Sequence, residues 1–285
     1  MTSKKNIGLF TIMSVSIISM AFILLPNKRM DDSLVGHWSF DEKKGYTIID
    51  KSSFKSNGEI KGVPKRADGI VGKRSLELNG KGDYIEILEN GTTPSHLQEL
   101  NKGSISVWFK ARNIPVGSNI LPVFYYGGKN GCDNMKDASN EGLVISLAHG
   151  EIDNESQGIY FTIFNNPCEY PTICFDSEPK SDSDDKRGTI NEGEWYHFVA
   201  VVGKNYNTGY LNGEEINYRS YNFSDAGASQ FFKDAQKHER LWIGKGFWDF
   251  GKETYFDGFI DDLRIYDIPL SGEEVKKLYK MKNAN

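Results

Sequence analysis

The chain has 285 residues, of which 38% are hydrophobic, 26% charged and 13% aromatic. The mean hydropathy of -0.50 excludes a polytopic membrane protein. The formal net charge of -5 comes without a basic stripe that could neutralise phosphates, so we expect no nucleic-acid partner. The many aromatic residues and 29 glycines favour short strands joined by tight turns over a helical bundle.

Residues 1–29 differ in composition from the rest of the chain. Lys4 and Lys5 precede an apolar run over residues 7–25, which is close to the shortest helix that spans a membrane. The same pattern is typical of a secretion signal, and Ser19-Met20-Ala21 offers a small-x-small cleavage site. A cleaved signal peptide and an N-terminal membrane anchor therefore both stay open. Either would place the following domain outside the membrane, at the cell surface or in the extracellular space.

From residue 33 the chain reads as strands separated by turn signals. Asn79-Gly80 between two alternating apolar runs predicts a hairpin, and residues 104–110 alternate apolar and polar positions. Only Ser271–Lys280 has a helical pattern, with Ser271 as N-cap and acidic residues in the first turn. The predicted strands are 35–40, 75–88 with its turn, 104–110, 143–147, 158–164, 195–202, 210–211, 241–243 and 256–266.

The absence of long helices alternating with strands argues against a parallel α/β fold. We therefore predict one all-β domain over residues 33–280, a sandwich of two antiparallel sheets or a jelly roll. The three cysteines, Cys132, Cys168 and Cys174, allow one disulfide and fit an exported protein, but the sequence leaves their pairing open.

Four segments, in this order, carry a resemblance that covers the whole domain. They are residues 36–45 with 50–53 and 57–58, residues 76–87, residues 103–110 with 195–202 and 210–214, and residues 257–266 with 270–271. In this ordered set the chain resembles the laminin-G-like branch of the concanavalin A-like lectin/glucanase superfamily. The resemblance implies a jelly roll whose members mostly bind glycans or proteins, while a minority are glycoside hydrolases. The expected partner is thus a glycan or an extracellular protein, and a structural or adhesion domain without a small ligand is a further alternative.

The resemblance also implies a structural Ca²⁺ site. Many relatives hold this ion between an acid in the last strand, an acid after the first strand and backbone carbonyls. Asp261 and Asp41 match the two acidic positions, and Gly80 or its neighbours could supply a carbonyl. Strand alternation places Asp261 on the core side with Leu263 and Ile265, where a carboxylate needs a partner. The alternative is that Asp261 accepts hydrogen bonds from backbone amides and Asp41 caps a turn.

Glu151, Asp153 and Glu155 have the types and spacing of the catalytic acids in the superfamily's laminarinase and lichenase type of hydrolase. There the period of two turns all three acids toward the substrate of a retaining glycosidase. In this sequence, however, Asn154 and Ser156-Gln157-Gly158 are typical of a turn between strands 143–148 and 158–164. We therefore expect a binding module rather than an enzyme, with hydrolysis as the alternative.

Aromatic side chains in predicted loops are the candidate glycan contacts, because sugar rings stack on aromatic faces. Phe247 and Trp248 lie between predicted strands, and Tyr125 and Tyr126 precede two glycines. The sequence therefore predicts a lectin-like module that binds through these four residues.

Overall fold

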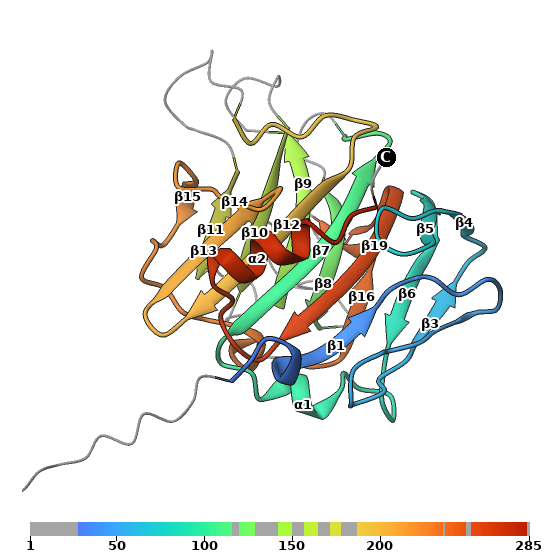
Figure 1. Ribbon diagram of the computed structural model, residues 1–285, viewed down its shortest axis with the longest axis horizontal. Coiled ribbons are helices and arrows are strands. Elements are labelled where there is room, and N and C mark those ends of the chain that lie inside the picture. Colours follow the sequence, from blue (N-terminus) through green and yellow to red (C-terminus); the bar gives the residue numbers. More distant parts are fainter. Residues whose placement is uncertain are drawn as a thin grey trace, which may run out of the picture.

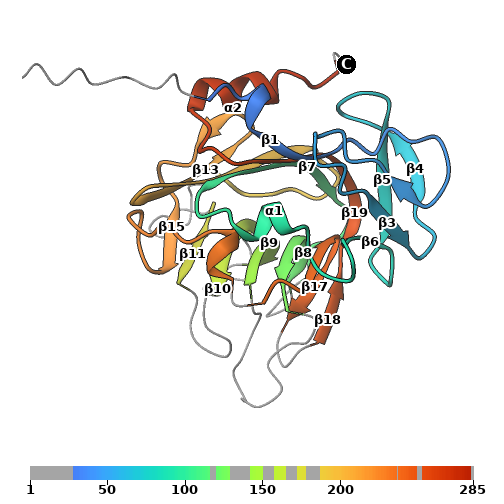
Figure 2. The ribbon, with the colours of Figure 1, turned by 90° about the horizontal axis from the view of Figure 1, so that it is seen from below.

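The computed structural model describes residues 28–115, 120–128, 142–149, 157–164, 172–177, 187–235, 237–248 and 252–283. Two large antiparallel sheets pack face to face in a sandwich, as Figure 2 shows from the side. The predicted all-β jelly-roll architecture is confirmed.

The first sheet has eight strands. Along it lie β14 (Glu214–Glu215), β13 (Tyr206–Leu211), β12 (Tyr196–Gly203), β7 (Gly103–Ala111), β19 (Asp257–Tyr266), β5 (Arg74–Asn79) and β4 (Lys65–Asp68), with β1 (Leu34–Trp38) also paired to β19.

The second sheet has nine strands. In spatial order these are β15 (Ser220–Phe223), β11 (Ile173–Asp176), β10 (Gln157–Phe164), β9 (Gly142–His149), β8 (Leu121–Gly127), β16 (Arg240–Ile243), β6 (Tyr84–Ile87), β3 (Gly58–Lys61) and β2 (Thr47–Ile48).

The main core lies between the two sheets. Strand alternation supplies it, as in β7, where Ile105, Val107 and Phe109 point inward and are fully buried. The predicted Asn79-Gly80 turn joins β5 to β6, and the backbone φ of Gly80 is +68°.

Each sheet also has an outer face that is covered in part (Figures 1 and 2). Helix α2 (Gly272–Tyr279) lies across the eight-stranded sheet and buries Val275 and Leu278 against it. Its N-cap is Ser271, as predicted, in a capping box with Glu274. A hairpin of β17 (Lys245–Trp248) and β18 (Lys252–Tyr255) packs on the outer face of the nine-stranded sheet. The remaining helical segments, α1 (Ser95–Gln98), η1 (Asp31–Ser33) and η2 (Phe232–Asp234), are short.

The expected loop around Tyr125 and Tyr126 is instead strand β8, between β9 and β16 near the middle of the nine-stranded sheet. Its apolar run shows no polar alternation because the core covers one face and the β17–β18 hairpin the other. Phe247 likewise lies in β17 rather than in an open loop.

The expected orientation of Asp261 is wrong because β19 contains a bulge. The register with β7 shifts between Asp261 and Arg264, and Asp262 has a φ of +45°. Ile260 faces the core before the bulge, and Leu263 and Ile265 face it afterwards. The bulge also divides one edge of β19, which pairs with β5 through residues 257–260 and with β1 through residues 263–266.

A histidine is buried beneath α2. His197 is stacked on Trp108 at 4.9 Å between ring centroids, and Tyr279 of α2 stacks on the same tryptophan at 5.5 Å. The Ser106 hydroxyl lies 2.8 Å from Nε2 of His197. Burial lowers the pKa of His197 to about 3, although the Asp262 carboxylate acts to raise it.

This burial predicts an acid-sensitive stability. Below pH 6.5 the unfolded chain takes up a proton at His197 that the folded chain does not, so the free energy of unfolding falls toward pH 3. The expected slope from this group is about 1.4 kcal/mol per pH unit. Urea denaturation between pH 7 and 4 should show a shallower decline for His197→Gln, which keeps an acceptor for Ser106. If the free energy of unfolding fell equally with pH in the wild type and in His197→Gln, His197 would not be the group responsible.

Candidate functional site

Two acids that are far apart in the sequence bind the backbone of one turn. This turn, residues 69–73, joins β4 to β5 and is called here the β4–β5 turn. Oδ2 of Asp261 accepts the N–H groups of Ile70 and Val71 at 2.9 and 3.0 Å. Oδ1 of Asp41 accepts those of Lys73 and Arg74 at 2.6 and 3.1 Å.

Asn283 binds the carbonyls of the same turn. Its backbone N–H donates to the carbonyl of Ile70 at 2.7 Å, and Nδ2 donates to the carbonyls of Gly69 and Gly72 at 3.1 and 2.8 Å. Gly72 has a φ of +71°, and a Cβ there would lie 2.7 Å from Oδ2 of Asp41. Only glycine therefore allows the turn to approach Asp41 so closely.

Asp261 has one carboxylate oxygen without a partner. The residue is fully buried, and among the described residues Oδ1 has no hydrogen bond. Burial raises the pKa of Asp261 to about 8, and the Asp262 carboxylate adds to this, while the N–H groups of Val71 and Ile70 oppose it. A buried carboxylate with an unpaired oxygen is the kind of group that a cation would stabilise.

The charge of Asp41 is better balanced. Burial acts to raise its pKa, but the N–H groups of Lys73 and Arg74 and the Lys51 ammonium, 3.4 Å from Oδ2, hold the pKa below its usual value. Two carboxylates are too few to coordinate a Ca²⁺ ion alone. Asp41 and Asp261 could therefore hold one only together with backbone carbonyls of the turn. In the part of the chain that the structure describes, no group of three or more His, Cys, Asp or Glu side chains could hold a metal. Gly80 lies at the other end of β5 from the turn, beside Asp257, so the structure does not bring it to the two acids.

Three of the four aromatic residues predicted to bind sugars are buried. Tyr125 and Tyr126 are fully buried and Phe247 is 4% exposed, so none presents a ring face to a ligand. The Tyr126 hydroxyl lies 2.6 Å from Nδ1 of His238, and Tyr126 packs in the main core. The side chain of Trp248 lies outside the described residues, as do the predicted hydrolase acids Glu151, Asp153 and Glu155.

The outer face of the nine-stranded sheet is aromatic but already occupied. The ammonium of Lys245, from β17, lies 4.4 Å from the ring centroid of Trp242 and 4.7 Å from that of Tyr84. It also forms an ion pair with Glu253 of β18 at 2.7 Å. Lys245 and its hairpin therefore fill the place that a ligand would need on this face.

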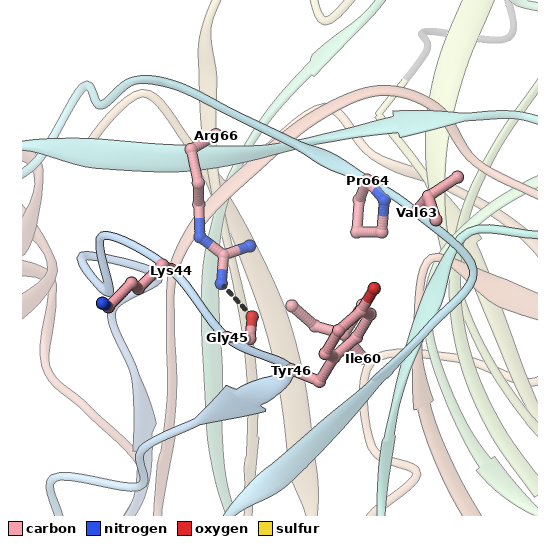
Figure 3. Close-up of a pocket in the computed structure, with 7 residues that line it drawn as sticks. All are labelled: Lys44, Gly45, Tyr46, Ile60, Val63, Pro64 and Arg66. Atoms are coloured by element: carbon pink, nitrogen blue, oxygen red, sulfur yellow. Dashed lines mark hydrogen bonds between the residues drawn. The ribbon is translucent and has the colours of Figure 1, made fainter.

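An exposed aromatic ring lies instead at the edge of the sandwich, in a hollow between strands of the two sheets. We call this the Tyr46 hollow; its volume is about 230 Å³, and it is lined by Lys44, Gly45, Tyr46, Ile60, Val63, Pro64 and Arg66 (Figure 3). The turn before β2 supplies Lys44, Gly45 and Tyr46, β3 supplies Ile60, and the segment entering β4 and β4 itself supply the rest.

The walls of the hollow differ in chemistry. Tyr46 is 62% and Val63 74% exposed, whereas Ile60 is buried at its base. From β4, Arg66 reaches across to Gly45, with Nη2 donating to the Gly45 carbonyl at 3.2 Å and Nε to the Glu42 carbonyl at 2.8 Å (Figure 3). The hollow thus combines an exposed aromatic ring, apolar side chains and an oriented guanidinium, which is the composition of a small-ligand site.

The domain model that matches residues 79–276 is described as the concanavalin A-like lectin/glucanases superfamily. The chain belongs to this superfamily. No curated protein sequence shows significant similarity to the chain.

Solved structures with the superfamily's fold include modules of larger proteins. Domain 4 of AbnA, a GH43 extracellular arabinanase from Geobacillus stearothermophilus in complex with arabinotriose, is 23% identical, with a TM-score of 0.55 over 87% of this chain and 98% of that domain. The receptor-binding domain of a botulinum neurotoxin C/D mosaic serotype is 16% identical, with a TM-score of 0.55 over 88% of this chain and 51% of that one.

A third structure is described by the dependence of botulinum neurotoxin type C cell entry on two ganglioside molecules. It is 13% identical, with a TM-score of 0.57 over 90% of this chain and 53% of that one. The chain therefore spans about half the length of the toxin structures. At these identities the likeness establishes a shared fold.

The sequence did not point to the Tyr46 hollow. Its turns were visible in Lys44-Gly45-Tyr46 and Gly62-Val63-Pro64, but the hollow exists only because β2 and β3 belong to one sheet and β4 to the other. The position of β4 relative to β2 and β3 depends on which strands pair with each other. Local sequence patterns do not specify that pairing.

Removing the Asp41 carboxylate should destabilise the domain. Asp41→Ala leaves the N–H groups of Lys73 and Arg74 without their acceptor, and we expect the free energy of unfolding to fall by roughly 1–3 kcal/mol. The measurement is urea denaturation in the presence of a chelator. Asp68→Ala, an exposed acid on β4 without a side-chain partner, is the matched control and should change stability by less than about 0.5 kcal/mol. An equal effect of the two substitutions would contradict a stabilising role for the hydrogen bonds between Asp41 and the β4–β5 turn.

Proposed function

We propose that this protein is an exported glycan-binding module and that the Tyr46 hollow is its binding site. The observation that carries the proposal is the Tyr46 ring, 62% exposed at the mouth of a hollow that has an oriented guanidinium on its opposite wall. Helix α2 and the β17–β18 hairpin cover parts of the two outer sheet faces, whereas the Tyr46 ring at the edge is open to solvent.

The chemistry of the hollow suits a sugar ring. The apolar C–H face of a sugar packs on an aromatic ring, while its hydroxyl groups require fixed polar partners around it. Tyr46 with Pro64 and Val63 would provide the apolar contact, and Arg66 would provide donors. The arabinotriose bound by the arabinanase domain, which has the same fold, supports carbohydrate as the ligand class.

Export and membrane attachment rest on the sequence of residues 7–25, which lie outside the described residues. Among the helices that the structure describes, none is long and apolar enough to cross a membrane. We propose that the N-terminal apolar run tethers the glycan-binding domain to the outer surface of the membrane.

We also propose that Ca²⁺ binds between Asp261 and Asp41 with carbonyls of the β4–β5 turn. The unpaired Oδ1 of Asp261 supports this assignment, because a divalent cation would compensate a buried carboxylate. The ion would stabilise the turn and take no part in chemistry.

An extracellular protein is the second candidate ligand at the same edge. Tyr46, Ile49, Phe54 and Val63 are all more than 40% exposed and lie within eighteen residues of sequence. Exposed apolar side chains in the segments around the edge strand β2 would suit a protein partner.

The glycan proposal predicts that Tyr46→Ala weakens sugar binding about fivefold, since an aromatic contact contributes on the order of 1 kcal/mol. A glycan array with the full-length protein identifies the ligand, and calorimetry measures its affinity. Tyr206→Ala, an exposed tyrosine near the opposite edge of the eight-stranded sheet, is the matched control and should bind like the wild type. Loss of binding in both variants would contradict the assignment.

The same ligand tests the hydrolase alternative. Incubation with the bound oligosaccharide should release no reducing ends, and Glu151→Gln and Glu155→Gln should leave affinity unchanged. If the wild type hydrolysed the oligosaccharide and either variant did not, the protein would be an enzyme and the binding-module proposal would be wrong.

The calcium proposal predicts stabilisation by mass action. At a Ca²⁺ concentration one hundred times Kd, the free energy of unfolding should rise by about 2.7 kcal/mol in the wild type. Asp261→Asn should abolish this gain and Asp68→Asn should retain it. A gain in Asp261→Asn, or none in the wild type, would refute the site.

A further inference from the structure

We propose that the Tyr46 hollow selects sugars that carry a carboxylate, such as uronic or sialic acids. This inference rests on the proposed glycan-binding function and names its ligand class. The residue that carries it is Arg66, and the reasons are its orientation, the charges around it and its lack of an ion pair.

Two backbone carbonyls hold the guanidinium in place. The Glu42 carbonyl accepts from Nε at 2.8 Å and the Gly45 carbonyl accepts from Nη2 at 3.2 Å. The third nitrogen, Nη1, has no hydrogen-bond partner among the described residues and points toward the space between Tyr46 and Pro64 (Figure 3). A fixed guanidinium with free N–H groups aimed into a hollow is preorganised for a charge-assisted hydrogen bond to an anion.

No carboxylate neutralises Arg66 directly. None of the residues lining the hollow is acidic, and the ammonium of Lys44, which is also among them, points away from the space between Arg66 and Tyr46 (Figure 3). Neither cation forms an ion pair within the part of the chain that the structure describes. In contrast, Arg112 is paired with Glu77 and Asp257, and Arg264 with Asp262.

Glu42 is an acid that acts on Arg66 without forming an ion pair with it, and its buried Oε2 has no hydrogen-bond partner among the described residues. Oε1 of Glu42 accepts the backbone N–H of Ile49 at 2.9 Å. Arg66 is half-buried; burial lowers its pKa, Glu42 acts to raise it and Arg74 lowers it further. A half-buried guanidinium beside a second arginine has more to gain from a ligand carboxylate than one in open water.

The apolar wall and the cation together define the ligand. Tyr46, Pro64 and Val63 would accept the face of a sugar ring, and a carboxylate on that ring would lie toward Nη1 of Arg66. A neutral sugar would keep the stacking contact but leave the cation unpaired. The discrimination between acidic and neutral sugars should therefore be about tenfold or more.

The test compares ligands that differ only in charge. Calorimetry with the full-length protein uses trigalacturonic acid and its methyl ester, and sialyllactose and its methyl ester. The wild type should bind the acid of at least one pair about tenfold more tightly than its neutral partner, and added NaCl should weaken only the acid. Arg66→Gln should bind both members of that pair equally, Arg66→Lys should retain part of the preference, and Lys204→Gln, an exposed lysine far from the hollow, should behave like the wild type. Thermal melts of each variant check that it is folded.

The outcomes separate the two claims. Neutral and acidic sugars bound with equal affinity by the wild type would overturn the carboxylate selectivity and leave the glycan-binding function standing. A preference that persists in folded Arg66→Gln would overturn the role of Arg66. If the wild type binds no glycan on an array, the proposed function fails and this inference fails with it.

Discussion

The carboxylates of Asp41 and Asp261 bind the backbone of the β4–β5 turn, and the edge of the sandwich depends on this contact. Four backbone N–H groups of residues 70–74 find their acceptors on these two side chains, while Asn283 binds carbonyls of the same turn. The bulge in β19 makes the contact possible, because it leaves a gap between β5 and β1 along one edge of that strand. Through the turn, the two acids fix β4 and therefore the position of Arg66.

Partial coverage of the two outer sheet faces is one reason to place the proposed binding site at the edge. An outer sheet face of a sandwich could bind a ligand. Here, however, α2 packs on part of one outer face and the β17–β18 hairpin on part of the other. The hairpin brings its own cation, Lys245, to the aromatic side chains of the nine-stranded sheet. The Tyr46 hollow has both an exposed ring and a guanidinium that forms no ion pair with any of the described residues.

The fold could be predicted from the sequence because its signals are local. Alternation in β7, the Asn79-Gly80 turn and the Ser271 cap each specify their element, and their order matched a known family. The side-chain positions that matter for binding depended on tertiary pairing instead. Tyr125 was expected in a loop but is buried in β8, which lies between the next strand, β9, and the distant strand β16 and is covered on both faces. The bulge at Asp261 likewise reversed an orientation that strict alternation had predicted.

A crystal structure of the protein with a bound acidic oligosaccharide tests the central claim most directly. We expect a sugar ring stacked on Tyr46, with its carboxylate within hydrogen-bond distance of Nη1 of Arg66 and the β4–β5 turn unchanged. A sugar bound on the outer face of the nine-stranded sheet, with the β17–β18 hairpin displaced from Tyr125 and Trp242, would contradict it.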